Sequence, residues 1–111
     1  MNLTIDRDLA LARVEGDVEL LQDLAQIFLG ELPQLTDRLR TGLACDDGKA
    51  VQHAAHALKG SAGNFAATAV FELAKQLEAM GRDGDLSEAP ITYEALEAEL
   101  DRLKNALTDL A

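Results

Sequence analysis

Apolar residues recur at intervals of three and four along most of this chain, and this spacing is what most limits its possible folds. The spacing is most regular near the C-terminus, where it runs through Tyr93, Leu96, Leu100, Leu103, Leu107 and Leu110. Residues spaced in this way lie along one side of an α-helix, and alternating threes and fours are typical of helices packed in bundles. The sequence therefore predicts an all-α protein.

The N-terminal half of the chain shows the same helical spacing. We expect a short helix over 6–14 with Leu9 and Ala12 facing inward, joined by Leu11 or Val14. Gly16-Asp17 predicts a break followed by an N-cap. The inward face of the next helix is predicted to hold Leu20, Leu21, Leu24, Ile27 and Phe28, continued by Leu35, Leu39 and Leu43. Around Gly30 to Pro33 this helix should break or bend, because a helix interior does not accept proline.

Turn residues divide the remaining sequence. Asp46-Asp47-Gly48 predicts a turn that also caps a helix, and Asn64 to Ala67 predict a link to a helix with Val70, Leu73, Leu77 and Met80 inward. Residues 81–90 have the composition of a loop, after which Thr92 is the expected cap of the last helix. The sequence thus predicts one domain over residues 1–111, an antiparallel four-helix bundle with a short N-terminal helical extension.

Charge and cysteine content exclude several classes of protein. The net charge of −10 argues against nucleic acid or anionic membrane as a partner. No apolar run approaches the roughly 18–20 residues that span a bilayer, and the acidic N-terminus is unlike a signal peptide. Cys45 is the only cysteine, so we expect a protein of the reducing cytoplasm. Residues 48–82 carry four basic and two acidic residues. The rest of the chain carries six basic and eighteen acidic residues, so the only basic stretch lies within 48–82.

That basic stretch contains a histidine on the polar side of a helix. The apolar stripe of residues 51–65 comprises Val51, Ala54, Ala55, Leu58, Ala62 and Phe65. On a helical wheel His56 lies about 140° from this stripe, Gly60 about 180° and Gly63 about 120°. Helical side chains lean toward the N-terminus, so the residue at position 60 normally covers the ring at 56. Each mid-helix glycine lowers helix stability by roughly 0.5–1 kcal/mol relative to alanine. Here the glycines leave the imidazole of His56 accessible.

An accessible imidazole beside a lysine suits phosphoryl chemistry. Histidine is largely neutral near pH 7, so a ring nitrogen of His56 can attack a phosphoryl group. Lys59, three residues on, can reach the same space and offset the added negative charge. A surface histidine without function is the alternative, but the two glycines on its own face and the lysine argue against it.

The run Ala55-His56-Ala57-Leu58-Lys59-Gly60-Ser61-Ala62-Gly63-Asn64-Phe65 resembles the signature of histidine-containing phosphotransfer (HPt) domains, the carriers of multistep phosphorelays. The resemblance extends over nearly the whole chain, since residues 9–33 and 68–82 look like the helices flanking that signature. It implies that His56 accepts the phosphoryl group, that Lys59 supports it and that Gly60 gives the partner access. Glu78 and Arg82 match family positions that line the histidine, although glutamine is common at the first. Ala66 stands where a glycine is frequent.

The resemblance also implies partners and a mode of action. We expect a cytoplasmic, monomeric carrier that exchanges phosphoryl groups with receiver domains of response regulators or hybrid sensor histidine kinases. No nucleotide loop or nucleophilic serine or cysteine motif is present, so the chain is not expected to be an enzyme. No intrinsic cofactor or metal is expected, because the magnesium and acidic pocket for in-line transfer belong to the receiver. The receiver should cover the exposed surface around the histidine, including Gln52, Lys59, Gly60, Gly63 and the helix bearing Glu78 and Arg82.

Two other functions remain as alternatives. His53 and His56, three residues apart on a helix, could supply two metal ligands, but carboxylates would have to complete the site because no further histidine exists. The chain could also be a non-catalytic helical interaction or dimerisation module, since an apolar seam alone indicates only packing. Acid-labile, alkali-stable phosphate on His56 would distinguish the carrier from both.

Overall fold

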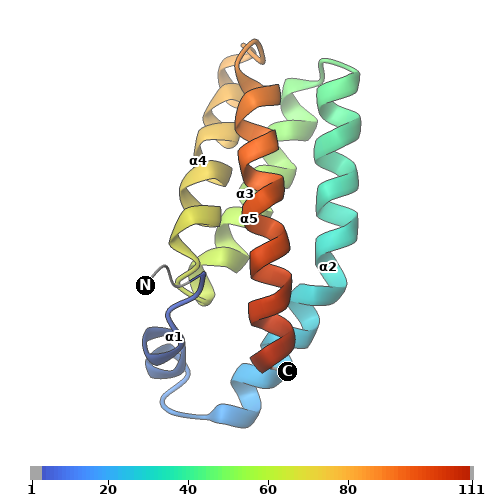
Figure 1. The fold of residues 1–111 in the computed structure, drawn as a ribbon. Helices are drawn as coiled ribbons and strands as arrows, with labels where there is room; N and C mark the ends of the chain where they lie inside the picture. The colour runs from blue at the N-terminus through green and yellow to red at the C-terminus, as the bar shows by residue number, and fades with distance from the viewer. Residues whose placement is uncertain (1–3, 111) are drawn as a thin grey trace.

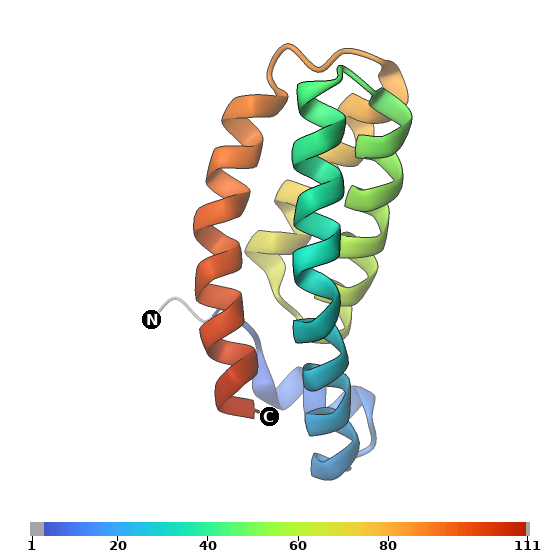
Figure 2. The same cartoon turned by 90° about the vertical axis from the view of Figure 1, so that its right-hand side faces the viewer.

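The computed structural model describes residues 4–110, which form five α-helices (Figure 1). The helices are α1 (Arg7–Arg13), α2 (Val18–Ala44), α3 (Gly48–Asn64), α4 (Thr68–Asp83) and α5 (Ala89–Leu110). Helices α2 to α5 run alternately up and down, and each packs against two others in the cyclic order α2, α3, α4, α5 (Figures 1 and 2). Helix α1 lies at the end of this bundle. The predicted four-helix bundle with an N-terminal extension is confirmed.

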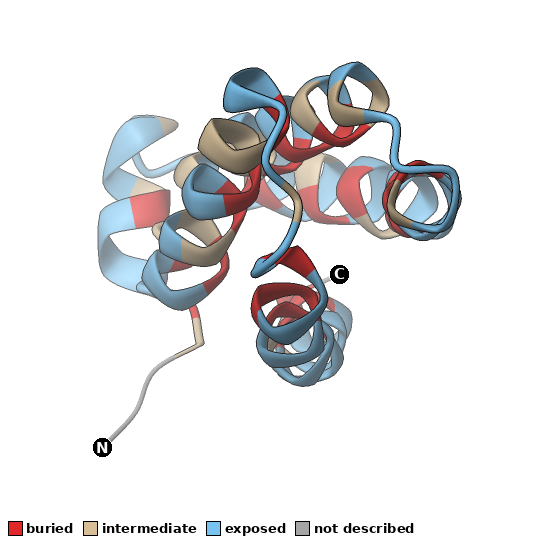
Figure 3. Cartoon of the chain, turned by 90° about the horizontal axis from the view of Figure 1, so that it is seen from above, coloured by how far each residue is buried: buried red, intermediate tan, exposed pale blue. Residues whose placement is uncertain are grey.

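The core follows the apolar spacing of the long helices. Seen from above, buried residues face the space between the helices and exposed residues face outward (Figure 3). Two predicted stripes are buried in full, those of α3 and α5. Phe65, just after α3, stacks on Phe28 of α2 with the ring centroids 5.8 Å apart. These contacts fix the side of α3 that faces the core, and therefore the opposite side that faces solvent.

Polar caps set the helix ends where the sequence predicts them. Asp17 and Asp47 are N-caps whose carboxylates accept the N–H groups of Leu20 and Ala50 at 3.0 and 3.1 Å. After α3, Ala66 takes a left-handed conformation with φ +51°. The N–H groups of Ala66 and Ala67 donate to carbonyls of the last turn of α3, as in a Schellman motif. A residue with a side chain costs about 1 kcal/mol more than glycine in this conformation. This cost explains why glycine is frequent at the position of Ala66 in the family that the motif resembles.

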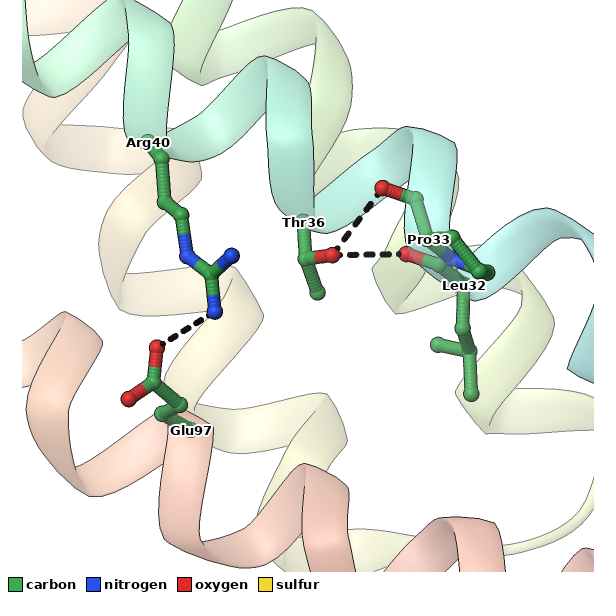
Figure 4. Close-up of polar contacts among 5 residues, drawn as sticks. All are labelled: Leu32, Pro33, Thr36, Arg40 and Glu97. Carbon is green, nitrogen blue, oxygen red and sulfur yellow. Dashed lines mark hydrogen bonds and ion pairs between the residues drawn. The ribbon is translucent and has the colours of Figure 1, made fainter.

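Helix α2 passes through Pro33 without interruption, so the predicted break is wrong. Its N-terminal part, light blue in Figure 1, runs at an angle to the rest, which agrees with the alternative of a bend. Proline removes one helical hydrogen bond and costs about 3 kcal/mol. Leu32, Leu35 and Leu39 are nevertheless buried around and beyond it, and their packing outweighs that cost. The Thr36 hydroxyl donates to the carbonyls of Leu32 and Pro33 at 3.0 and 3.1 Å (Figure 4).

One ion pair joins α2 to α5 across the surface. The guanidinium of Arg40 lies 3.0 Å from the carboxylate of Glu97, and both side chains are largely exposed (Figure 4). An exposed pair of this kind contributes about 0.2–1 kcal/mol. The buried seam of α5 therefore dominates the attachment of this helix.

Several predicted inward faces are wrong near the N-terminus. In α1, Leu9 and Ala12 are exposed, Ala10 is fully buried and Leu11 is half-buried. Val14, the C-cap of α1, is also half-buried. A helix of seven residues is too short for its spacing to define one face. In α2, Leu20 and Ile27 are exposed. The first turn of α2 extends past the end of α5 in Figures 1 and 2, and in this part of α2 the buried side is the one that carries Leu21, Ala25 and Phe28.

The predicted loop over residues 81–90 is too long at both ends. Helix α4 continues to Asp83 and ends at Gly84, whose φ of +74° is left-handed, and α5 begins at Ala89. Thr92 is therefore buried inside α5, where its hydroxyl donates to the carbonyl of Glu88 at 3.3 Å, and is not a cap. Pro90 lies in the first turn of α5, where a helix accepts proline.

The backbones of α3 and α4 are in close contact at two glycines, Gly48 and Gly81. A Cβ added at Gly81 would lie 2.5 Å from the carbonyl oxygen of Gly48 and 2.6 Å from the backbone nitrogen of Gln52. Both obstacles are backbone atoms and cannot turn aside. This contact sets the spacing of the two helices that carry the site described below.

Replacement of Gly81 by alanine should therefore destabilise the protein by about 1–3 kcal/mol, because the two backbones must move apart. Gly30 is the matched control, since a Cβ there meets nothing within 4 Å. Gly30→Ala should stabilise by about 0.5–1 kcal/mol. Urea unfolding of both variants measures the difference. Equal midpoints for Gly81→Ala and wild type would refute the close backbone contact.

Candidate functional site

The accessible histidine is where the helical wheel of α3 places it. The side chain of His56 is 69% exposed on the face of α3 opposite the buried stripe. Gly60, one turn later, is exposed, and a Cβ added there would meet nothing within 4 Å. The ring is therefore open on the side from which residue 60 would otherwise cover it. The predictions for the exposure of His56 and Gly60 are confirmed.

A carboxylate from the neighbouring helix joins His56 to Lys59. Glu78 of α4 contacts His56 Nδ1 through one oxygen and Lys59 Nζ through the other, the latter at 2.6 Å. The Glu78 side chain is only 14% exposed and that of Lys59 is 24% exposed, so both groups are largely shielded from water. These three residues are called here the His56 cluster. His56 and Lys59 belong to the motif on α3, and Glu78 comes from α4.

The lysine controls the charge of Glu78. The Lys59 ammonium, and to a smaller extent the His56 ring, hold the pKa of the Glu78 carboxyl below its ordinary value of 4.5 against the opposing effect of burial. The group is therefore ionised throughout the neutral range. Its interactions stabilise the fold fully above pH 4.5, and this contribution is lost as the pH falls through the lowered pKa.

An ionised carboxylate determines which ring nitrogen of His56 is free. A carboxylate only accepts hydrogen bonds, so the Nδ1 atom that contacts Glu78 must carry the proton. In the neutral ring the lone pair then lies on Nε2, the nitrogen farther from Glu78. The cluster can thus present a nucleophilic nitrogen to solvent while holding the ring by its other side.

The remaining predicted site residues lie around the cluster in different ways. Gln52 and His53 line a shallow hollow together with His56 and Glu78. Gly63 is half-buried, and its missing Cβ would lie 3.7 Å from the ring of Phe71. Arg82 is exposed, and its Nε lies 3.6 Å from a carboxylate oxygen of Asp83. No ion pair or hydrogen bond joins Arg82 to the His56 cluster within residues 4–110.

Two features near the site could not be found from the sequence. One is the double contact of Glu78. The other is an attachment of α1, in which the guanidinium of Arg13 donates to the carbonyl of Gly63, fifty residues away. Neither contact leaves a signal in local spacing, because each joins separate helices. In the described part of the chain, no three His, Cys, Asp or Glu side chains lie close enough together to hold a metal ion.

Comparison with known proteins decides the family. The sequence profile described as "Hpt domain" matches residues 23–106, which is most of the chain. The chain belongs to the HPt domain family. As an HPt domain it is a phosphotransfer carrier of phosphorelays, and such proteins are carriers rather than enzymes with kinase motifs.

Individual relatives agree with this assignment. The chain is 30% identical over 104 residues to the signal transduction histidine-protein kinase BarA of Shigella flexneri. That match includes 94% of this HPt domain and 11% of the much longer kinase, so the chain spans about a tenth of the length of this relative. The crystal structure of HptB from Pseudomonas aeruginosa PAO1 has the same fold, with a TM-score of 0.88 at 24% identity over 98% of this chain and 95% of HptB. No helix among the described residues is long and apolar enough to cross a membrane.

Proposed function

We propose that His56 is the phosphoacceptor of this HPt domain, taking a phosphoryl group from the aspartate of one receiver domain and passing it to another. The observation that carries this proposal is the His56 cluster, in which an exposed ring is held at Nδ1 by Glu78 and left open above Gly60. A buried histidine would not be open to a partner, and an unanchored histidine would not be held at Nδ1.

The transfer requires no proton to move before attack. The Nε2 lone pair of His56 attacks the phosphorus of the receiver's aspartyl phosphate, the N–P bond forms and the bond from phosphorus to the carboxylate oxygen breaks. The imidazole ring then carries a positive charge, which Glu78 stabilises through the Nδ1 proton. Lys59 offsets the charge of the phosphoryl oxygens. Onward transfer reverses these steps with a second receiver aspartate, which leaves the ring in its starting tautomer.

Other groups are supplied by the partner. Magnesium and the acidic pocket that hold the phosphoryl group in line belong to the receiver, and this chain supplies the nucleophile, the lysine and an open approach. A receiver of a response regulator or of a hybrid sensor histidine kinase fits this role equally. The carrier itself acts as a monomer in this proposal and needs no cofactor.

The test is direct phosphorylation. The protein is mixed with a phosphorylated receiver domain, and peptide mapping should find one acid-labile, alkali-stable phosphate at His56. Profiling against the receiver domains of the host then identifies the partners. Phosphate on another residue, or none with any receiver, would overturn the proposal and favour a non-catalytic interaction module.

The role of Glu78 can be tested separately. Glu78→Gln keeps an oxygen that can accept a hydrogen bond from Nδ1–H but removes the negative charge, so transfer should slow by up to about tenfold, equivalent to about 1.4 kcal/mol. Glu78→Ala removes the contact altogether and should slow transfer further. Nitrogen NMR of the ring should show the Nδ1–H tautomer in the wild type and a mixture in Glu78→Ala. A wild-type tautomer ratio in Glu78→Ala would show that Glu78 does not orient the ring.

A further inference from the structure

The His56 cluster joins two helices, so its geometry depends on the distance between them. His56 and Lys59 lie on α3, and the Glu78 carboxylate reaches them from α4. The contact from Glu78 to Lys59 Nζ is 2.6 Å long, whereas N–H···O hydrogen bonds extend only to about 3.2 Å. A retreat of the carboxylate by about 1 Å would therefore break this bond.

One carboxylate serves two donors, which limits how far Glu78 can adjust. Its two oxygens contact two different side chains of α3, and its own side chain is only 14% exposed. If α4 moved away, a rotation that restored one contact would draw the other oxygen away from its donor. The double contact therefore requires the present spacing of α3 and α4.

Gly81 lies about one turn after Glu78 on α4 and meets the backbone of α3. A Cβ added at Gly81 would lie 2.5 Å from the carbonyl oxygen of Gly48. It would also lie 2.6 Å from the backbone nitrogen of Gln52, which is one turn before His56. Ordinary van der Waals contact lies at about 3.5–4.0 Å, so a side chain at Gly81 would displace one helix by about 1 Å.

On the other side of the cluster a side chain separates the two helices. A Cβ added at Gly63 would lie 3.7 Å from the ring of Phe71, which is an ordinary contact. Along α4, Glu78 is about one turn from Gly81 and about two turns from Phe71. The backbone contact at Gly81 is therefore the nearer of the two, and it controls the position of Glu78.

We propose that Gly81 is a positioning residue for phosphoryl transfer, because its missing side chain holds α4 where Glu78 contacts His56 and Lys59 together. Gly81 is buried and acts through Glu78, which selects the Nδ1–H tautomer of the acceptor ring. This inference rests on the proposed function, in which the Nε2 lone pair attacks phosphorus. The tautomer of His56 can nevertheless be measured without any transfer.

Two substitutions, called here the spacing variants, push the same helices apart from opposite sides. Gly81→Ala adds a Cβ on α4. Gly48→Ala adds one on α3, 2.7 Å from the carbonyl oxygen of Gly81, at the first residue of the helix, where the backbone shifts more readily. Both are made in a Gly30→Ala parent, because that substitution at an open position offsets the expected loss of stability. Gly48→Ala decides the outcome if Gly81→Ala does not fold.

Nitrogen NMR of the His56 ring and transfer from a phosphorylated receiver measure the effect. The parent should show the Nδ1–H tautomer, and both spacing variants should show a mixture, as expected for Glu78→Ala. The transfer rate at saturating receiver should fall by about tenfold in Gly81→Ala, since misplaced groups lose catalytic effect steeply with distance. The half-saturating concentration should change much less, because the exposed side chains around His56 are unchanged.

Gly42→Ala in the same parent is the matched control. A Cβ there would lie 2.9 Å from Cγ2 of Val51 and 3.3 Å from Cβ of Ala50, so it forces α2 away from the same turn of α3. It should lower the urea midpoint but keep the tautomer and transfer rate of the parent, because α2 carries no member of the His56 cluster. The comparison separates the spacing of α3 and α4 from a general loss of stability.

The parental tautomer in both spacing variants would overturn the inference, as would an equal shift of the tautomer in Gly42→Ala. A shifted tautomer with the parental transfer rate would also overturn it, because the spacing would then not matter for transfer. The proposed function fails separately, if no phosphate is found on His56 of the wild-type protein. If His56 is labelled and the spacing variants behave as the parent, only the positioning inference fails.

Discussion

His56→Gln is expected to abolish phosphoryl acceptance while leaving the bundle intact. Glutamine has no ring nitrogen with a nucleophilic lone pair, so the N–P bond cannot form. The side chain is 69% exposed and contributes little packing, so the free energy of unfolding should change by less than about 0.5 kcal/mol apart from the lost contact with Glu78. Transfer from a phosphorylated receiver, circular dichroism and thermal melting measure these effects.

His53→Gln is the matched control, because it makes the same substitution on the same helix, one turn earlier. His53 is exposed and has no contact with Glu78 or Lys59 among the described hydrogen bonds and ion pairs. It should retain most of the transfer activity. Equal loss in the two variants would show that the assignment of one acceptor is wrong.

Gly60→Gln is expected to abolish transfer without destabilising the protein. A side chain at this position leans back over the ring of His56 and blocks an incoming aspartyl phosphate. Because a Cβ at Gly60 meets nothing within 4 Å, the substitution should be stable, and replacing a helical glycine should add up to about 1 kcal/mol. Paired melting curves and transfer rates therefore separate access to the ring from folding.

Gly30→Gln is the control for this experiment, since Gly30 is an equally open glycine inside α2. It should give a similar gain in stability and leave transfer unchanged. Lys59→Ala gives a third pattern, in which the ring stays open and the loss of a cation slows transfer without stopping it. A wild-type rate for Gly60→Gln would disprove the role of the glycine in giving access.

Much of the site was accessible to sequence reasoning because it lies on one helix. The positions of His56, Lys59 and Gly60 relative to the apolar stripe of α3 follow from the constant rotation per residue. The resemblance to HPt domains added Glu78 and Arg82, which lie on another helix. Of these two, only Glu78 contacts the histidine, and Arg82 pairs with Asp83.

Local patterns failed where a tertiary contact decides the outcome. Helix α2 continues through Pro33 because leucines around it are buried in the bundle. Leu20 and Ile27 are exposed because the buried side of that part of α2 is the one that carries Leu21, Ala25 and Phe28. Thr92 looks like a cap in sequence, but α5 begins earlier, at Ala89, and buries it.

The sequence by itself determined the helical class, the buried stripes of α3 and α5 and the accessible histidine, since each depends on the geometry of a single helix. Only the tertiary structure decided that Glu78 holds both His56 and Lys59 and that Gly81 sets the spacing of α3 and α4. These features depend on distances between helices, which the packing of the whole core determines and which no local spacing encodes.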